Sequence, residues 1–153
     1  MKFKRSGGIL LHPTSLPGKF GIGDLGTNAY RWVDFLSDTK SKLWQILPLG
    51  QTRYGDSPYQ CFSAFAGNTY LISPELLYEV DLLDREDIKK KPTFTSDHVD
   101  FGSVIPWKKQ LLTKAAVKFL EDNNHKLVTE YARFTSDESF WLDDYALFLV
   151  LKG

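Results

Sequence analysis

Two short apolar runs, separated by a glycine-rich loop and an amphipathic segment, constrain the fold of this chain most strongly. Residues 7–12 are apolar and end at Pro13, and residues 43–48 form a similar bounded run, as is typical of buried strands. Between them, apolar residues recur at helical spacing over residues 28–39, with Thr27 as the predicted N-cap. The order strand, helix, strand predicts parallel strands in an α/β fold.

The second half of the chain has helical patterns only. Ser73 and Pro74 are typical of an N-cap and a first helical position. A wide apolar stripe with four-residue spacing predicts a long helix, and its members are Trp107, Leu111, Ala115 and Phe119. Thr135 and Glu138 fit a capping box ahead of a last helix.

That last helix, over residues 140–151, becomes apolar on all sides. A helix of this kind is normally buried all round, and two strands with a few amphipathic helices offer too little to cover it. Two parallel strands alone also make a poor sheet. We therefore expect the chain to be truncated, with the missing partners beyond Gly153.

Charge and composition argue against several classes of function. The chain has 19 basic and 19 acidic residues, whereas nucleic-acid binders normally carry a basic excess. A single cysteine, Cys61, excludes an internal disulfide, and the three histidines lack the spacing of metal ligands. No signal-peptide core precedes Pro13, and the most apolar run, residues 145–151, is far below the ~20 residues of a membrane span. We predict a cytoplasmic protein without cofactor or metal.

Residues 21–26 match the dinucleotide-binding pattern G-x-G-x-x-G, and a predicted helix follows them. In that fingerprint the glycines directly follow a strand, and an acidic residue lies near the end of the next strand. Here the proline-rich residues 13–17 intervene, and residues 46–50 contain no carboxylate. The pattern therefore does not indicate a nucleotide site.

A segment rich in tyrosine and polar side chains, residues 54–60, directly follows the second predicted strand. Its Gly, Asp, Ser and Pro residues all favour a simple surface turn. Alternatively, its two tyrosines could stack on sugar rings while the hydroxyl, amide and carboxylate groups bind sugar hydroxyls. The residues alone leave both interpretations open.

Three other candidates for chemistry are weaker. Asp143 and Asp144 are adjacent on a helix and point about 100° apart, so they cannot converge on one bond, and a helix-terminal role is favoured. Cys61 has no histidine near it in sequence to activate it as a nucleophile. His12, at the end of the first strand, could anchor a loop or contact a ligand.

Long blocks of the sequence resemble the amylomaltases, or 4-α-glucanotransferases. The matching blocks run in order over nearly the whole chain: residues 8–18, 44–50, 54–60, 62–68 and 141–148, followed by Lys152 and Gly153. The resemblance implies an α/β fold, a partial (β/α)8 TIM-type barrel contributing its first two strands, with a mainly helical insertion. Residues 1–72 would start the barrel, including the substrate loop, and residues 73–153 would form the insertion.

The resemblance also implies transfer of α-1,4-glucan segments between maltooligosaccharides with retention at the anomeric carbon. Retention needs a carboxylate nucleophile and an acid/base carboxyl group, which the family takes from later barrel strands. None of those motifs occurs here, so no catalytic residue is assigned and the chain alone is expected to be inactive. The alternative is a non-catalytic carbohydrate-binding module; the oligomeric state is not predicted.

Substrate contact is what the resemblance carries over to this chain. Tyr59 matches the tyrosine that stacks on the sugar beside the scissile bond, and Ser57 and Asp56 match loop residues next to it. Tyr54 matches an aromatic residue associated with a secondary glucan-binding surface. The sequence departs from the commonest form of the family at Gln51, Arg53, Cys61 and Thr69. These departures bear on fine specificity, such as donor length, and not on the reaction class.

Overall fold

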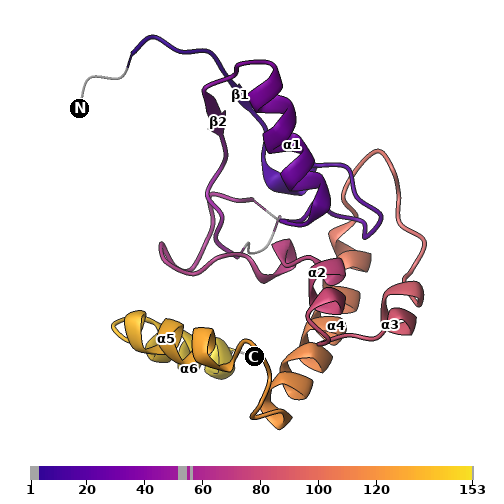
Figure 1. Ribbon diagram of the computed structural model, residues 1–153, viewed down its shortest axis with the longest axis vertical. Coiled ribbons are helices and arrows are strands. Elements are labelled where there is room, and N and C mark those ends of the chain that lie inside the picture. Colours follow the sequence, from indigo (N-terminus) through magenta and orange to yellow (C-terminus); the bar gives the residue numbers. More distant parts are fainter. Residues whose placement is uncertain (1–3, 52–54, 56, 153) are drawn as a thin grey trace.

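The computed structural model describes residues 4–51, 55 and 57–152. Two three-residue strands, β1 (Gly8–Leu10) and β2 (Leu43–Gln45), lie parallel and pair Ile9 with Trp44. Helix α1 (Thr27–Asp38) connects them and packs along the pair, which confirms the predicted strand–helix–strand unit (Figure 1). Because the strands are parallel, the loop after β1 and the loop after β2 both start at the carboxyl end of the sheet.

The strands are shorter than the apolar runs that predicted them, and the expectation that they are buried is wrong. Leu10 and Leu43 are more than half exposed, and only the central residue of each strand is partly covered. The reason is geometric, because α1 covers one side of the pair and the described residues provide no second layer for the other. Apolar composition predicted a burial of the strands that the described residues do not provide.

The helix starts agree with the sequence in position but differ in detail. Gly26, rather than Thr27, is the N-cap of α1, so Thr27 is its first residue. The carboxylate of Asp24 accepts the N–H of Gly26 at 3.0 Å, which closes a turn just before the helix, and no side chain caps the first turn of α1 among the described residues. Ser73 and Pro74 take the predicted positions at the start of α2 (Pro74–Glu79), although the Ser73 hydroxyl makes no cap hydrogen bond.

A long helix, α4 (Phe101–Glu121), provides the main core of the second half. The predicted stripe is confirmed: Trp107, Leu111 and Ala115 are buried, and Phe119 packs partly buried beside them. Trp107 stacks on Phe20 from the loop after β1, with ring centroids 5.8 Å apart. Helix α4 is thereby packed against the loop that follows β1.

Charged residues at 84–91 cap a short helix and pair with a lysine of α4. Asp87, within α3 (Arg85–Lys89), accepts the N–H of Asp84 at 2.9 Å, which caps the helix. The same carboxylate pairs with Lys114 of α4 at 2.7 Å. This ion pair is exposed on the lysine side and contributes little stability, but it fixes the side of α4 that α3 approaches.

The capping box predicted for Thr135 and Glu138 is wrong. Thr135 lies inside α5 (Val128–Asp137), where its hydroxyl donates to the Ala132 carbonyl, and Glu138 is the C-cap of that helix. The last helix, α6 (Leu142–Lys152), begins later, and its first turn carries Asp143 and Asp144. Both carboxylates thus lie at the positive end of the helix dipole, as the helix-terminal interpretation predicted.

Helix α6 has no buried residue in the part of the chain that the structure describes. Leu147, Val150 and Leu151 are mostly exposed. The all-round apolar character of this helix is therefore present in the sequence without matching burial in the structure.

Candidate functional site

The loop that follows β2, residues 49–68, carries the tyrosine-rich segment and is closed at its base. The N–H of Asn68 donates to the carbonyl of Leu49 at 2.6 Å, which joins the two ends of the loop. Gly50 lies so close to Cys61 that a Cβ on the glycine would come within 2.3 Å of the Cys61 Cβ. We refer to residues 49–68 as the substrate loop, because they include the residues that the sequence analysis predicts to contact sugar.

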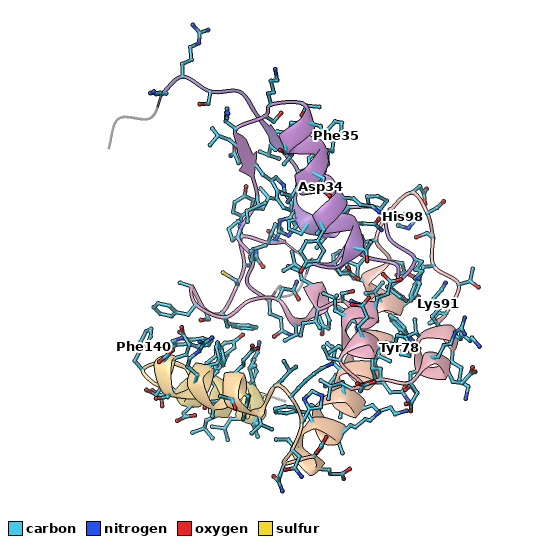
Figure 2. The ribbon with its side chains drawn as sticks, viewed as in Figure 1. Asp34, Phe35, Tyr78, Lys91, His98 and Phe140 are labelled. Atoms are coloured by element: carbon cyan, nitrogen blue, oxygen red, sulfur yellow. The ribbon has the colours of Figure 1, made fainter. Side chains whose placement is uncertain are left out.

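Aromatic contacts attach the second half of the substrate loop to the end of the chain. Phe62 lies edge-on to Phe148 of α6, with ring centroids 5.3 Å apart. Phe65 lies edge-on to Phe140 at the same distance and is stacked on Trp141. Figure 2 labels Phe140 at the end of the α5–α6 pair, close to this loop. Ring pairs of this kind contribute ~0.5–1.5 kcal/mol each beyond the area they bury.

The predicted sugar-contacting residues are only partly visible. Tyr59 is 70% exposed, and no ring of the described residues stacks on it. Ser57 is half-buried, and its carbonyl accepts the N–H of Gln60 at 3.1 Å, so a tight turn presents Tyr59 to solvent. Tyr54 and Asp56 lie outside the described residues. The structure thus places Ser57 and Tyr59 in one turn of the loop that follows β2.

His12 lies in the loop that follows β1. It is the N-cap of the 3-10 turn η1 (Pro13–Ser15), and its carbonyl accepts the N–H of Ser15 at 2.9 Å. Burial lowers the pKa of the imidazole, so the ring is neutral at pH 7. Its Nδ1 atom is buried, without a hydrogen-bond partner among the described residues. The backbone of His12 anchors the loop, while its side chain is a neutral group beside the strand end.

The glycine pattern at residues 21–26 has a packing explanation. Gly21 has a φ of +76°, a conformation that L side chains rarely adopt. A Cβ on Gly23 would approach the Pro13 carbonyl oxygen to 2.1 Å, and one on Gly26 would meet the Ser73 hydroxyl at 2.4 Å. The carboxylate of Asp24 already occupies the N-terminus of α1, where a phosphate would bind in a nucleotide site. Close backbone approach therefore accounts for these glycines.

Replacing Gly23 with alanine is expected to lower the free energy of unfolding by about 3 kcal/mol, at the upper end of overpacking effects. The clashing atoms are backbone atoms of Pro13 and Leu16, which cannot rotate away. Gly7→Ala is the matched control, because no atom lies within 4 Å of a Cβ at that position. Urea titration of both variants measures the difference, and equal stabilities would contradict the packing explanation.

Two anchoring residues were missed by the sequence analysis. Asn68 is buried, and its side chain accepts the N–H of Tyr70 at 2.9 Å, which starts the 3-10 turn η2 (Thr69–Leu71). Lys108 is fully buried on α4. The available signal for Lys108 was its place on the apolar face, four residues after Val104 and next to Trp107.

Cys61 and the aspartate pair show no catalytic arrangement among the described residues. Cys61 is a half-buried free cysteine against Gly50. Burial raises the pKa of the nearby Tyr145 hydroxyl, and Cys61 adds to this rise.

Comparison with known proteins identifies the family. A family model described as 4-alpha-glucanotransferase matches residues 11–153. The chain belongs to the 4-α-glucanotransferase family. A 4-alpha-glucanotransferase of Thermus thermophilus is 46% identical over 153 residues, covering 100% of this chain. One from Synechocystis is 47% identical over 149 residues, covering 97% of the chain.

The fold agrees with a solved member of the 4-α-glucanotransferase family. An amylomaltase from Streptococcus agalactiae in complex with acarbose superposes with a TM-score of 0.87 at 42% identity, covering 97% of this chain and 30% of that one. The chain likewise spans 30% of the length of the Thermus and Synechocystis relatives. Among the described residues, no helix is long and apolar enough to cross a membrane.

Proposed function

We propose that the protein carrying this chain is a 4-α-glucanotransferase that transfers α-1,4-glucan segments between maltooligosaccharides with retention. The observation that carries the proposal is the family match over residues 11–153, together with an exposed tyrosine in the loop after β2. In this proposal residues 1–72 begin a (β/α)8 barrel and residues 73–153 form a helical insertion. A cytoplasmic location, consistent with the single cysteine, belongs to the same proposal.

Carbohydrate contact is the role proposed for the residues of this chain. A flat, exposed Tyr59 ring can stack on the apolar face of a glucose unit, and the Ser57 hydroxyl in the same turn can hydrogen-bond to the sugar. Asp56 is proposed to contact the same sugar region as Ser57, and Tyr54 is proposed to belong to a secondary glucan-binding surface. The ionised nucleophile and the acid/base carboxyl group would come from residues outside this chain, which supplies no catalytic residue in the proposal.

Transfer requires the glycosyl-enzyme intermediate to react with a sugar hydroxyl in preference to water. In the first step the glycosidic bond breaks as the leaving oxygen takes a proton and the anomeric carbon bonds to the carboxylate. In the second step the hydroxyl of the acceptor glucan displaces that carboxylate and returns its proton to the base. Holding the acceptor ring in place favours this outcome because positioning removes most of the entropic cost of the encounter.

Incubation of the full-length gene product with maltotriose tests the proposal directly. Glucose that appears together with maltooligosaccharides longer than maltotriose is the expected result, and a heat-inactivated sample is the control. Intact maltotriose would remove the transferase assignment. Glucose and maltose without longer products would indicate a hydrolase and would also contradict the proposal.

A further inference from the structure

A fully buried lysine on helix α4 donates to the 3-10 turn η2, which directly follows the substrate loop. Lys108 is 0% exposed, and its Nζ atom donates to the carbonyl oxygen of Ile72 at 2.6 Å. Burying an ammonium group in an apolar interior costs several kcal/mol unless it is paired and hydrogen-bonded. This side chain therefore needs its partners, and their position shows what it holds.

The Ile72 carbonyl that accepts from Lys108 lies next to η2, where three segments of the chain meet. The carbonyl of Leu71 accepts the N–H of Leu25 at 2.8 Å, from the loop before α1. The N–H of Asn68 donates to the carbonyl of Leu49 at the start of the substrate loop. The carbonyl oxygen of Ile72, the C-cap of η2, accepts a hydrogen bond from the Nζ atom of Lys108. Helix α4 thus meets the loops after β1 and β2 at one point.

We infer that Lys108 is a positioning residue, which fixes η2 and thereby the substrate loop at the angle that presents Tyr59 to a glucan. The inference rests on the proposed function for its catalytic consequence, but the mechanical link exists independently of activity. Lys108 lies on α4 and acts through Ile72 and Asn68. It is not a catalytic residue, because it touches neither the exposed turn nor a surface that a glucan could reach.

The charges around Lys108 come from several elements. Asp24, in the loop before α1, is a carboxylate whose charge acts on Lys108, and it also interacts with Glu75 of α2 and with Lys19, which form an ion pair with each other. Tyr70 of η2 packs against Val104, one turn from Lys108 on α4. Burial lowers the pKa of Lys108 to about 8, and Asp24 opposes that shift. Burial likewise raises the pKa of the Asp24 carboxyl, and Lys108 opposes that rise.

Lys108→Met tests the inference, with Lys109→Met as the matched control because Lys109 is the next residue on α4 and is exposed. Methionine fills a similar volume and removes the cost of burying a charge, but it leaves the Ile72 carbonyl without its donor, so the two effects oppose each other in the overall stability. We expect the amides of Leu25 and Asn68 to exchange with deuterium at least 10-fold faster, the effect of losing about 1.4 kcal/mol locally. Amides of α5 should be unchanged. We also expect kcat/KM for maltotriose to fall about 10-fold.

A role in stability alone would leave the exchange of Leu25 and Asn68 and the value of kcat/KM within twofold of Lys109→Met, and this result would overturn the inference. If Lys108→Met does not fold, Asp24→Asn provides the second variant. It keeps a side-chain oxygen for the Gly26 N–H but removes the charge that faces Lys108. Faster exchange at Asn68 is then expected, and unchanged exchange there overturns the inference. Wild-type protein without transferase activity would contradict the proposed function while leaving the exchange test valid.

The pH dependence of stability provides an independent check on the charge of Lys108. Its pKa is lowered from 10.5 to about 8 in the folded protein. Between these two pH values the unfolded chain therefore binds more protons than the folded one, so the free energy of unfolding should rise with pH across this window. The rise should be absent in Lys108→Met and present in Lys109→Met. Urea titrations at pH 7.5, 9 and 10 measure it, and identical slopes in both variants would exclude a buried, titrating Lys108.

Discussion

Tyr59→Ala in the full-length gene product is expected to lower kcat/KM for maltotriose on the order of 10²-fold. The ring is 70% exposed, so its removal takes away a surface for stacking on sugar without opening a cavity. Loss of the ring would leave the reacting glucan loosely placed, and a misplacement of about 1 Å can cost this factor. Rates of glucose release from maltotriose measure the effect.

Two comparisons make the Tyr59 result specific. Tyr59→Phe keeps the ring and should retain most of the rate, because stacking depends on the aromatic face. Tyr30→Ala removes a similarly exposed tyrosine from α1 and should leave the rate within twofold. Tyr59→Ala with wild-type kcat/KM and unchanged stability would remove Tyr59 from the substrate site.

Trp107→Ala is expected to lower the free energy of unfolding by about 3–5 kcal/mol, the usual cost of removing a large buried aromatic side chain. Trp107 is only 9% exposed, and its ring contacts Phe20 and Phe94, with centroids 5.8 and 5.5 Å away. Its loss would open a cavity between α4 and the loop after β1, which Phe20 and Trp107 join.

Leu120→Ala provides the control for Trp107, since Leu120 lies on the same helix and is 65% exposed. Its effect should stay within about 0.5 kcal/mol, as for most surface substitutions. Urea titration followed by circular dichroism measures both variants. Equal losses for the two would show that Trp107 does not hold the core of this region.

Features that depend on neighbouring residues in the sequence were easier to predict than contacts between distant segments. The apolar stripe on α4 and the start of α2 at Ser73–Pro74 were predicted correctly, because helical spacing and helix starts depend on neighbouring residues. The N-cap of α1 was predicted one residue too late, because the turn that Asp24 closes on Gly26 is followed directly by the helix. The capping box at Thr135 was wrong because α5 continues past this residue to Asp137. Burial of the strands was wrong because it depends on layers outside the local sequence.

The sequence by itself determined the family, the parallel strand–helix–strand unit, and the position of the tyrosine-rich loop after the second strand. Only the tertiary structure revealed that the glycines of residues 21–26 accommodate close backbone contacts. Only the tertiary structure also revealed that Lys108 meets the Ile72 carbonyl, 36 residues away along the chain. The physical reason is that periodicity and turn chemistry act over a few residues, whereas the desolvation of a charge depends on every segment that folds around it.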